Sequence, residues 1–229
     1  MPKWLDNAVF YEIYPQSFLD TNADGIGDFQ GIINKLDYIR GLGCNALWIN
    51  PCFLSPFGDA GYDVADYYRV APRYGTNEDL KRLFAEAHKR EIHVLLDLVP
   101  GHTSVEHEWF RESMKAERNA YTDRYVWTDS VWEAPENMGC LRGISQRDGS
   151  CAINFFTCQP ALNYGYYNRT RPWQQSPDDE GPKATLNAMM DVMRFWLGLG
   201  CDGFRVDMAA SLVKNDPDSL GTIALWQKV

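Results

Sequence analysis

The chain has 229 residues, of which 45% are hydrophobic and 23% are charged, as is typical of a globular protein with a substantial core. Acidic residues outnumber basic ones by 31 to 22, and the resulting net charge of −9 disfavours nucleic acid or an anionic membrane as a partner. It permits a neutral substrate. No segment approaches the run of about 18 apolar residues that a membrane span needs, and the amino terminus lacks a secretory-signal pattern. We therefore expect a cytoplasmic protein.

The first part of the chain alternates short apolar runs with helical patterns. Residues 9–14 predict a strand ended by Pro15, and apolar side chains at helical spacing predict one helix over 29–40. A second buried strand is expected at 45–49. The loop over 51–75 is too long for a simple connection, which favours a functional role for it.

A second helix and a third strand follow this loop. Thr76, with Asp79 three residues later, has the pattern of a capping box and predicts a helix that runs to about residue 90. Residues 92–99 are nearly continuously apolar except for Asp97. Such a run is typical of a strand in a parallel sheet that is covered on both faces.

Periodicity breaks down over 103–182, a stretch with many Trp, Asn, Gly and Pro residues that we interpret as an inserted subdomain. The pattern then resumes with a helix over 183–199 and a strand over 202–207. Strands that alternate with helices imply right-handed βαβ units and a parallel sheet.

The predicted fold class is α/β, a (β/α)8 TIM barrel of which only the first four β/α units are present. A complete barrel takes about 250 residues without insertions, so this chain is expected to be a fragment of a longer enzyme. The predicted domains are 1–102, the first half of the barrel with strands 1–3, the inserted subdomain 103–182, and 183–229, in which the barrel continues to the start of helix 4.

The fourth predicted strand carries two charged residues on one face. Arg205 and Asp207 are two residues apart, so in a strand their side chains point the same way. In a parallel barrel this face lies inside, at the carboxyl end. An Arg within about 4–6 Å would keep the Asp ionised, as a nucleophile that attacks a sugar carbon requires. The alternative is a structural ion pair at a strand end.

Further polar residues are predicted at the same end of the barrel. Asp97 closes the third strand and His102 lies just beyond it, while Asp59 and Tyr62 belong to the long loop after the second strand. A His that meets an Asp, a Tyr and an Arg–Asp pair at one rim is more often functional than a lone His.

Taken together, these residues resemble the α-amylase superfamily of glycoside hydrolases and transglycosidases. The likeness covers essentially the whole chain and is carried, in chain order, by segments 11–15, 25–28, 61–67, 97–102, 159–163 and 203–207. The branch of oligo-1,6-glucosidases, α-glucosidases and trehalose synthases is the most similar.

The resemblance implies a retaining mechanism on α-glucosidic bonds. Asp207 would be the nucleophile, Arg205 would orient it, and Asp97 would brace Arg205. Retention needs a second carboxyl about 5–5.5 Å from the nucleophile. In the family this is a Glu on a fifth strand, which this sequence does not contain, so the chain alone is expected to be inactive.

The resemblance also implies a sugar pocket. Asp59, Tyr62 and His102 would line the site of the non-reducing glucose, with Tyr62 stacked on the ring, and Phe155 and Gln159 would wall it. The expected substrate is an α-linked gluco-oligosaccharide or disaccharide. Two alternatives stay open, namely a transglycosylase or isomerase of the same fold, such as a trehalose synthase or a sucrose-cleaving enzyme, and a non-catalytic sugar-binding or transporter-subunit relative.

A separate constellation, residues 20–28, has oxygen-bearing side chains at alternate positions, which suits a hard cation with 6–8 oxygen ligands. It differs from an EF-hand because Gly31 occupies the twelfth position. The alternative is a loop of Asx turns. The resemblance implies a structural Ca²⁺ or Mg²⁺ site, and its ligands would be Asp20, Asn22, Asp24, Asp28 and the carbonyl of Ile26.

Two further features complete the predictions. Gly101 stands where the family usually has an Asn before the active-site His, and in amylases this Asn helps to bind an interdomain calcium. We therefore expect no such second metal site. Cys44 and Cys201 are expected to be buried as small hydrophobic residues, and a disulfide among the other cysteines is not favoured.

Overall fold

The computed structural model describes residues 2–229. Its strands are β1 Phe10–Ile13, β2 Ala46–Ile49, β3 Phe53–Leu54, β4 Asp66–Val70, β5 His93–Leu98, β6 Gly139–Leu141, β7 Cys151–Ile153 and β8 Gly203–Val206. Its α-helices are α1 Phe29–Asn34, α2 Leu36–Gly41, α3 Asn77–His88, α4 Glu108–Ser113, α5 Glu180–Leu199 and α6 Leu220–Lys228, with short 3-10 helices at Lys3–Asn7 and Pro15–Ser17.

The chain divides into two compact units. The first unit consists of Met1–Leu54, Tyr67–Leu98 and Val192–Arg205. The second unit consists of Ser55–Asp66, Val99–Asp191 and Val206–Val229. Segments that are far apart in the sequence therefore build each unit.

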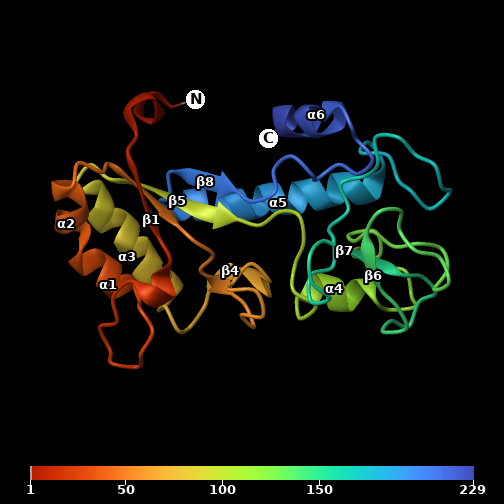
Figure 1. The fold of residues 1–229 in the computed structure, drawn as a ribbon, viewed down its shortest axis with the longest axis horizontal. Coiled ribbons are helices and arrows are strands. Elements are labelled where there is room, and N and C mark those ends of the chain that lie inside the picture. Colours follow the sequence, from red (N-terminus) through yellow and green to blue (C-terminus); the bar gives the residue numbers. More distant parts are fainter. Residues whose placement is uncertain (1) are drawn as a thin grey trace. The chain divides into compact units, whose positions relative to one another are not determined.

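A parallel sheet forms the centre of the first unit. Its strands lie in the order β1-β2-β5-β8, and Figure 1 shows the yellow β5 next to the blue β8. Strand β2 pairs in parallel with β1 and with β5, and the register places Trp48 beside Leu95. All four strands predicted from the sequence are present, each within two residues of the expected bounds.

Helices α1 and α3 pack on each other, and α3 packs on β5. The apolar side chains of the predicted helix 29–40 are buried, among them Phe29, Leu36 and Ile39. The prediction of one continuous helix was wrong, because Lys35 has φ −109° and ψ 3° and separates α1 from α2. The Lys35 N–H is shared between the carbonyls of Ile32 and Ile33, so the chain makes a tight turn while its apolar positions still face the core.

The start of α3 follows the predicted capping box. The Asp79 N–H donates to Thr76 Oγ1 at 3.2 Å, and the Thr76 N–H donates to Asp79 Oδ2 at 2.9 Å. These two bonds satisfy backbone donors that the first turn of a helix leaves open. The buried residues Leu80, Leu83 and Phe84 then form the inward face of α3.

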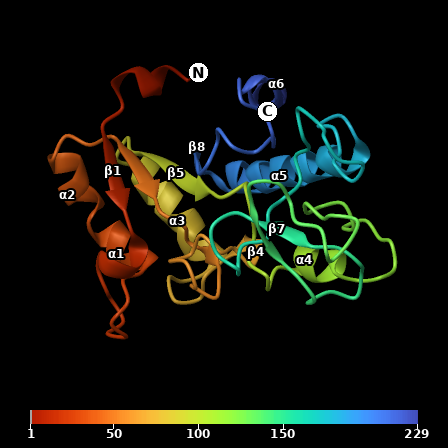
Figure 2. The ribbon, with the colours of Figure 1, turned by 45° about the vertical axis from the view of Figure 1, so that its right-hand side comes forward.

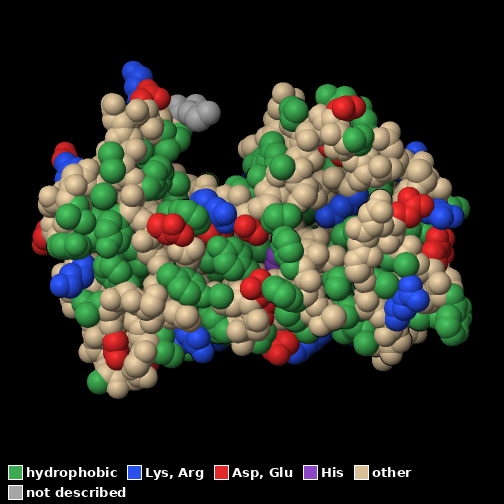
Figure 3. Space-filling view, viewed as in Figure 1, with side chains coloured by type: hydrophobic (Ala, Val, Ile, Leu, Met, Phe, Trp, Pro, Cys, Tyr) green, Lys and Arg blue, Asp and Glu red, His purple; other side chains and the backbone are tan. Residues whose placement is uncertain are grey.

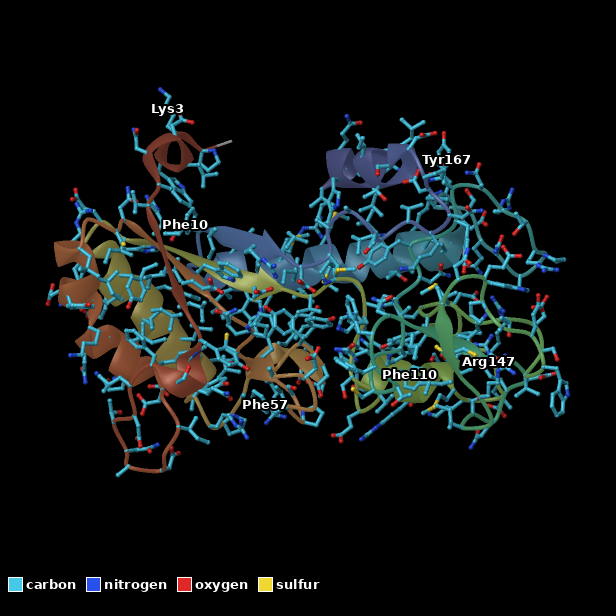
Figure 4. All side chains as sticks on the ribbon, in the orientation of Figure 1. Lys3, Phe10, Phe57, Phe110, Arg147 and Tyr167 are labelled. Atoms are coloured by element: carbon cyan, nitrogen blue, oxygen red, sulfur yellow. The ribbon has the colours of Figure 1, made fainter. Side chains whose placement is uncertain are left out.

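The second unit has little regular structure apart from α4, α6, the antiparallel pair β6–β7 and the first part of α5. Figure 2 shows α4 and β7 among long loops. Its aromatic core includes Phe110, whose ring stacks 6.1 Å from Trp127 and meets Tyr125 edge-on at 5.1 Å. The guanidinium of Arg147 lies 4.8 Å from the Trp127 ring, and Figure 4 labels Phe110 and Arg147 in this unit. The unit is thus held by aromatic packing more than by secondary structure.

Three whole-chain features bear on the predictions. Cys44 and Cys201 are buried as expected, and all six cysteines have free thiols. Across residues 2–229, no helix combines the length and the apolar character that crossing a membrane requires. On the face drawn in Figure 3, acidic and basic side chains are interspersed.

Candidate active site

Three neighbouring strands of the first unit bring together Trp48, Asp97 and Arg205. Asp97 is only 2% exposed. The Trp48 indole N–H donates to Asp97 Oδ2 at 3.0 Å, and Arg205 Nη1 lies 3.2 and 3.3 Å from the two Asp97 oxygens. The Arg205 guanidinium also lies over the Trp48 ring, 4.7 Å from its centroid. The buried carboxylate is therefore compensated by a positive charge and a neutral donor.

This cluster orients Arg205. A planar guanidinium that is held by a carboxylate and an aromatic face has few rotamers left. The contact predicted between Asp97 and Arg205 is thus present, whereas the sequence analysis missed Trp48. The signal was available, because Trp48 lies beside Leu95 in the sheet and Asp97 is two residues beyond Leu95, on the same face.

In the second unit, the loop 55–63 is folded around the fully buried carboxylate of Asp63. This carboxylate accepts hydrogen bonds from Ser55 Oγ at 2.9 Å, the Gly58 N–H at 2.8 Å and the Asp59 N–H at 3.0 Å. The Tyr62 N–H donates to the Asp59 carbonyl at 2.8 Å. Asp63 therefore fixes the backbone that carries Asp59 and Tyr62, a role that the sequence analysis did not assign.

Asp59 is oriented further by Gln159. The Gln159 amide donates to Asp59 Oδ2 at 2.6 Å, and its oxygen accepts from the Phe156 N–H at 3.2 Å. Gln159 is fully buried. Two residues that are 100 positions apart are thus joined by a direct side-chain bond, which leaves Asp59 Oδ1 available for other donors.

His102 is the buried centre of this group, at 1% exposure. Asn154 Nδ2 lies 3.1 Å from His102 Nδ1, and the Phe155 ring meets the imidazole edge-on at 6.0 Å. Burial lowers the pKa of His102 to about 4, although the Asp207 carboxylate and the Tyr62 backbone act in the opposite direction. At neutral pH the imidazole is therefore uncharged, and it lies in the field of the Asp207 carboxylate.

The structure divides the predicted site residues between the two units. The second unit contains Asp59, Tyr62, His102, Phe155, Gln159 and Asp207. The first unit contains Asp97 and Arg205. Asp207 directly follows β8 and is partly exposed. In the second unit a reachable carboxylate, a neutral imidazole, oriented polar groups and aromatic rings therefore occur together, a combination that suits a sugar whose reacting carbon is attacked by a carboxylate.

The predicted metal loop 20–28 is ordered by Asx turns. Asp20 accepts backbone N–H groups from Asn22, Ala23 and Gly25 at 3.0, 2.7 and 2.8 Å, and these bonds, led by that of Gly25, lower the pKa of Asp20. Asp28 caps α1 by accepting the Gly31 N–H at 2.7 Å.

Other side chains of the loop bond within it. Asp24 accepts the Ile26 N–H at 2.8 Å and the Asn22 amide at 3.2 Å. The donor set of oxygens with three carboxylates fits a hard cation in its chemistry. From residue 2 to the end of the chain, however, no group of three or more His, Cys, Asp or Glu side chains is arranged to hold a metal.

This chain is similar to known proteins over most of its length. Residues 12–222 match the family model described as "Alpha amylase, catalytic domain". The oligo-1,6-glucosidase of Heyndrickxia coagulans is 40% identical over 222 residues, which cover 93% of this chain and 37% of that protein. The trehalose synthase/amylase TreS of Mycolicibacterium smegmatis is 40% identical over 213 residues, which cover 93% of this chain and 35% of that protein.

The chain is also similar to the solved structure of a relative. The Bacillus licheniformis trehalose-6-phosphate hydrolase TreA superposes with a TM-score of 0.78 at 38% identity, over 91% of this chain and 36% of TreA. The chain thus spans little more than a third of the length of the relatives it matches. The prediction of a partial (β/α)8 barrel is confirmed, with four parallel strands present.

Proposed function

This chain belongs to the α-amylase family, and on that premise we propose that the full-length protein is a retaining enzyme that cleaves α-glucosidic bonds in short oligosaccharides or disaccharides. The observation that carries the proposal is the surroundings of Asp207. Its negative charge raises the pKa of the buried His102 against the larger effect of burial, and the His102 ring meets the Phe155 ring edge-on. A carboxylate close to hydrogen-bonding groups and an aromatic ring suits attack on a bound glucosyl unit.

In the proposed first step, an Asp207 oxygen bonds to the anomeric carbon as the bond from that carbon to the leaving oxygen breaks. A carboxylic acid elsewhere in the full-length protein gives its proton to the leaving oxygen. In the second step, water attacks the anomeric carbon while its proton passes to the deprotonated acid, and the bond to the Asp207 carboxylate breaks. Inversion at each step gives net retention. We propose that this acid is the Glu implied by the family resemblance.

The other residues would position the sugar. The neutral His102 can donate one hydrogen bond to a sugar hydroxyl, and Asp59 can accept one, because Gln159 occupies only part of its capacity. We expect Tyr62 and Phe155 to cover apolar faces of the ring. Arg205, which the Asp97 carboxylate holds in place, would have the role of orienting the nucleophile that the family resemblance implies.

A second candidate function is glucosyl transfer or isomerisation. Relatives named oligo-1,6-glucosidase and trehalose synthase are each 40% identical to this chain. Hydrolysis and transfer share the covalent intermediate and differ only in whether water or a sugar hydroxyl attacks it. Analysis of the products in the presence of glucose or fructose as acceptor would separate the two functions.

The proposal is tested by incubating the full-length protein with isomaltose, maltose, sucrose and trehalose and measuring glucose. We expect release from at least one substrate, and its loss in Asp207→Asn. Asp218→Asn is the matched control, because it makes the same chemical change at an exposed position and should retain activity. Absence of glucose and of transfer products with every substrate, or full activity of Asp207→Asn, would reject the proposal.

We also propose that the loop 20–28 binds Ca²⁺ or Mg²⁺ in a structural role and that the protein is cytoplasmic. The oxygen-only donors of the loop support the first proposal. The six free thiols support the second, since a reducing compartment keeps cysteines unpaired. Chelation should lower the melting temperature of the wild type but not of Asp24→Ala, and an unchanged melting temperature would contradict metal binding.

A further inference from the structure

The amide of Asn154 bridges two acceptors beside the proposed sugar pocket. Asn154 directly follows β7. Its Nδ2 lies 2.9 Å from the Gly101 carbonyl oxygen and 3.1 Å from His102 Nδ1. The Asn154 backbone N–H donates to the Gln159 carbonyl at 3.1 Å, which fixes the start of the side chain. One amide group therefore meets a carbonyl and an imidazole nitrogen at the same time.

The orientation of this amide follows from its partners. A carbonyl oxygen can only accept, so the group that faces Gly101 must be the NH₂ group and not the oxygen of Asn154. The NH₂ group has two hydrogens and no lone pair to offer. Its second hydrogen therefore points to His102 Nδ1, which must accept. A neutral imidazole that accepts at Nδ1 carries its proton on Nε2.

Gly101 provides the space that this contact needs. A Cβ atom at position 101 would lie 3.0 Å from Asn154 Nδ2 and 3.8 Å from a methyl group of Leu212. Unlike the glycines that have positive φ, Gly101 lies outside the left-handed region, so the backbone does not itself demand glycine. What the position requires is the absence of a side chain.

We propose that Asn154 is a positioning residue that fixes His102 as the Nε2–H tautomer, and that Gly101 is needed because it leaves room for this amide. The fixed tautomer places the hydrogen-bond donor of the ring at Nε2. The catalytic consequence rests on the proposed function, whereas the tautomer does not.

Three charged groups affect the pKa of His102. Asp207 and Asp63 act on the imidazole with negative charge and Lys214 acts with positive charge, while burial dominates and keeps the ring neutral. The Tyr62 backbone also hydrogen-bonds to the ring. The Asn154 amide can only donate to Nδ1, so its hydrogen bond favours the proton on Nε2.

Substitution of Asn154 tests the direction of this bond. Asn154→Leu removes the donor at similar volume, so both tautomers should become populated. Asn154→Asp replaces the donor by an acceptor, so Nδ1 should become protonated and the imidazolium form should persist to higher pH. Asn168→Asp is the matched control, because Asn168 is exposed and lies in the same unit.

The first readout is the pair of ring ¹⁵N chemical shifts of His102 in the full-length protein with labelled histidine, assigned with a His102→Gln variant. We expect an unprotonated Nδ1 and a protonated Nε2 in the wild type, and a protonated Nδ1 in Asn154→Asp. A protonated Nδ1 in the wild type would overturn the proposal whatever the variants do, even if every variant failed to fold.

The second readout is kinetic. We expect Asn154→Leu to raise KM by about 2- to 13-fold, the size of one lost hydrogen bond, with a smaller change in kcat. Asn154→Asp should add an ionisation to the pH profile of kcat/KM that Asn168→Asp lacks. Gly101→Ala should weaken binding in the wild type but not in an Asn154→Ala background, and equal effects in the two backgrounds would overturn the role of Gly101. Inactivity towards every glucoside would reject the proposed function but leave the tautomer result standing.

Discussion

His107 should make the protein less stable in mild acid. Its ring is 5% exposed, packs against Trp109 at 4.6 Å between centroids, and accepts the Trp109 N–H at Nδ1 over 3.1 Å. Burial, followed by the positive charge of Arg124, lowers the pKa of His107 from 6.5 to about 3. The unfolded chain therefore takes up a proton at a pH where the folded protein does not.

The sign and size of the effect follow from this difference. Above pH 6.5 both states have a neutral His107, so the group contributes no pH dependence. As the pH falls below 6.5 the unfolded state is stabilised, at about 1.4 kcal/mol per pH unit, until the folded pKa is reached. At about pH 5 the loss is about 2 kcal/mol. His102, with its pKa lowered to about 4, adds a loss of similar size.

The substitution His107→Asn removes the titrating ring and keeps a side chain that can cap α4. The assay is urea unfolding of wild type and variant at about pH 7.5 and about pH 5. The variant loses packing at both pH values, so the informative quantity is the change in its destabilisation between them. We expect the destabilisation to be smaller by about 2 kcal/mol at the lower pH. An equal destabilisation at both values, within about 0.5 kcal/mol, would refute the reasoning.

Three other substitutions give distinct outcomes. Asp97→Asn removes the buried carboxylate that pairs with the partly exposed Arg205 and should cost about 1–3 kcal/mol in urea unfolding, and a cost below about 0.5 kcal/mol would contradict a stabilising pair. Burial raises the pKa of Asp202, but hydrogen bonds from His93, His88 and the Val94 N–H outweigh it and lower the pKa. The ionised Asp202 therefore stabilises the fold above its ordinary pKa of 3.8. Asp202→Asn should therefore destabilise at neutral pH, and the difference from wild type should shrink as the pH falls below 3.8, whereas a constant difference would argue against it. Thr76→Ala should cost about 1 kcal/mol by loss of the cap, while Thr157→Ala, at an exposed position outside the helices, serves as a non-cap control.

The strands of the barrel could be predicted because local pattern and final environment agree. The strand over 92–99 is almost entirely apolar, and in β5 all residues except His93 and Leu95 are buried. Its one acidic residue, Asp97, bonds to Trp48 and Arg205. The capping box at Thr76 is equally local. The break at Lys35 escaped prediction because apolar spacing is the same for one helix and for two short helices that share a face.

The site was harder to predict from the sequence because its hydrogen bonds join loops that are distant in the chain. Predicting the bond between Asp59 and Gln159 requires knowing how two long loops meet, and no pattern in either loop encodes it. Asn154 gave no signal for the same reason, because its importance depends on the space left by Gly101 and on the position of His102. Composition predicted a loop-rich subdomain over 103–182 and gave no sign of the aromatic packing around Phe110 and Trp127.

Covalent trapping tests the central assignment most directly. The full-length protein would be incubated with a fluorinated glucosyl donor that forms the glycosyl-enzyme rapidly and releases it slowly, then digested and analysed by peptide mass spectrometry. We predict one glucosyl adduct, on the peptide that contains Asp207, and its disappearance when an unlabelled substrate competes. Labelling of a different carboxylate, or turnover of the donor with Asp207 replaced by Asn, would contradict the account.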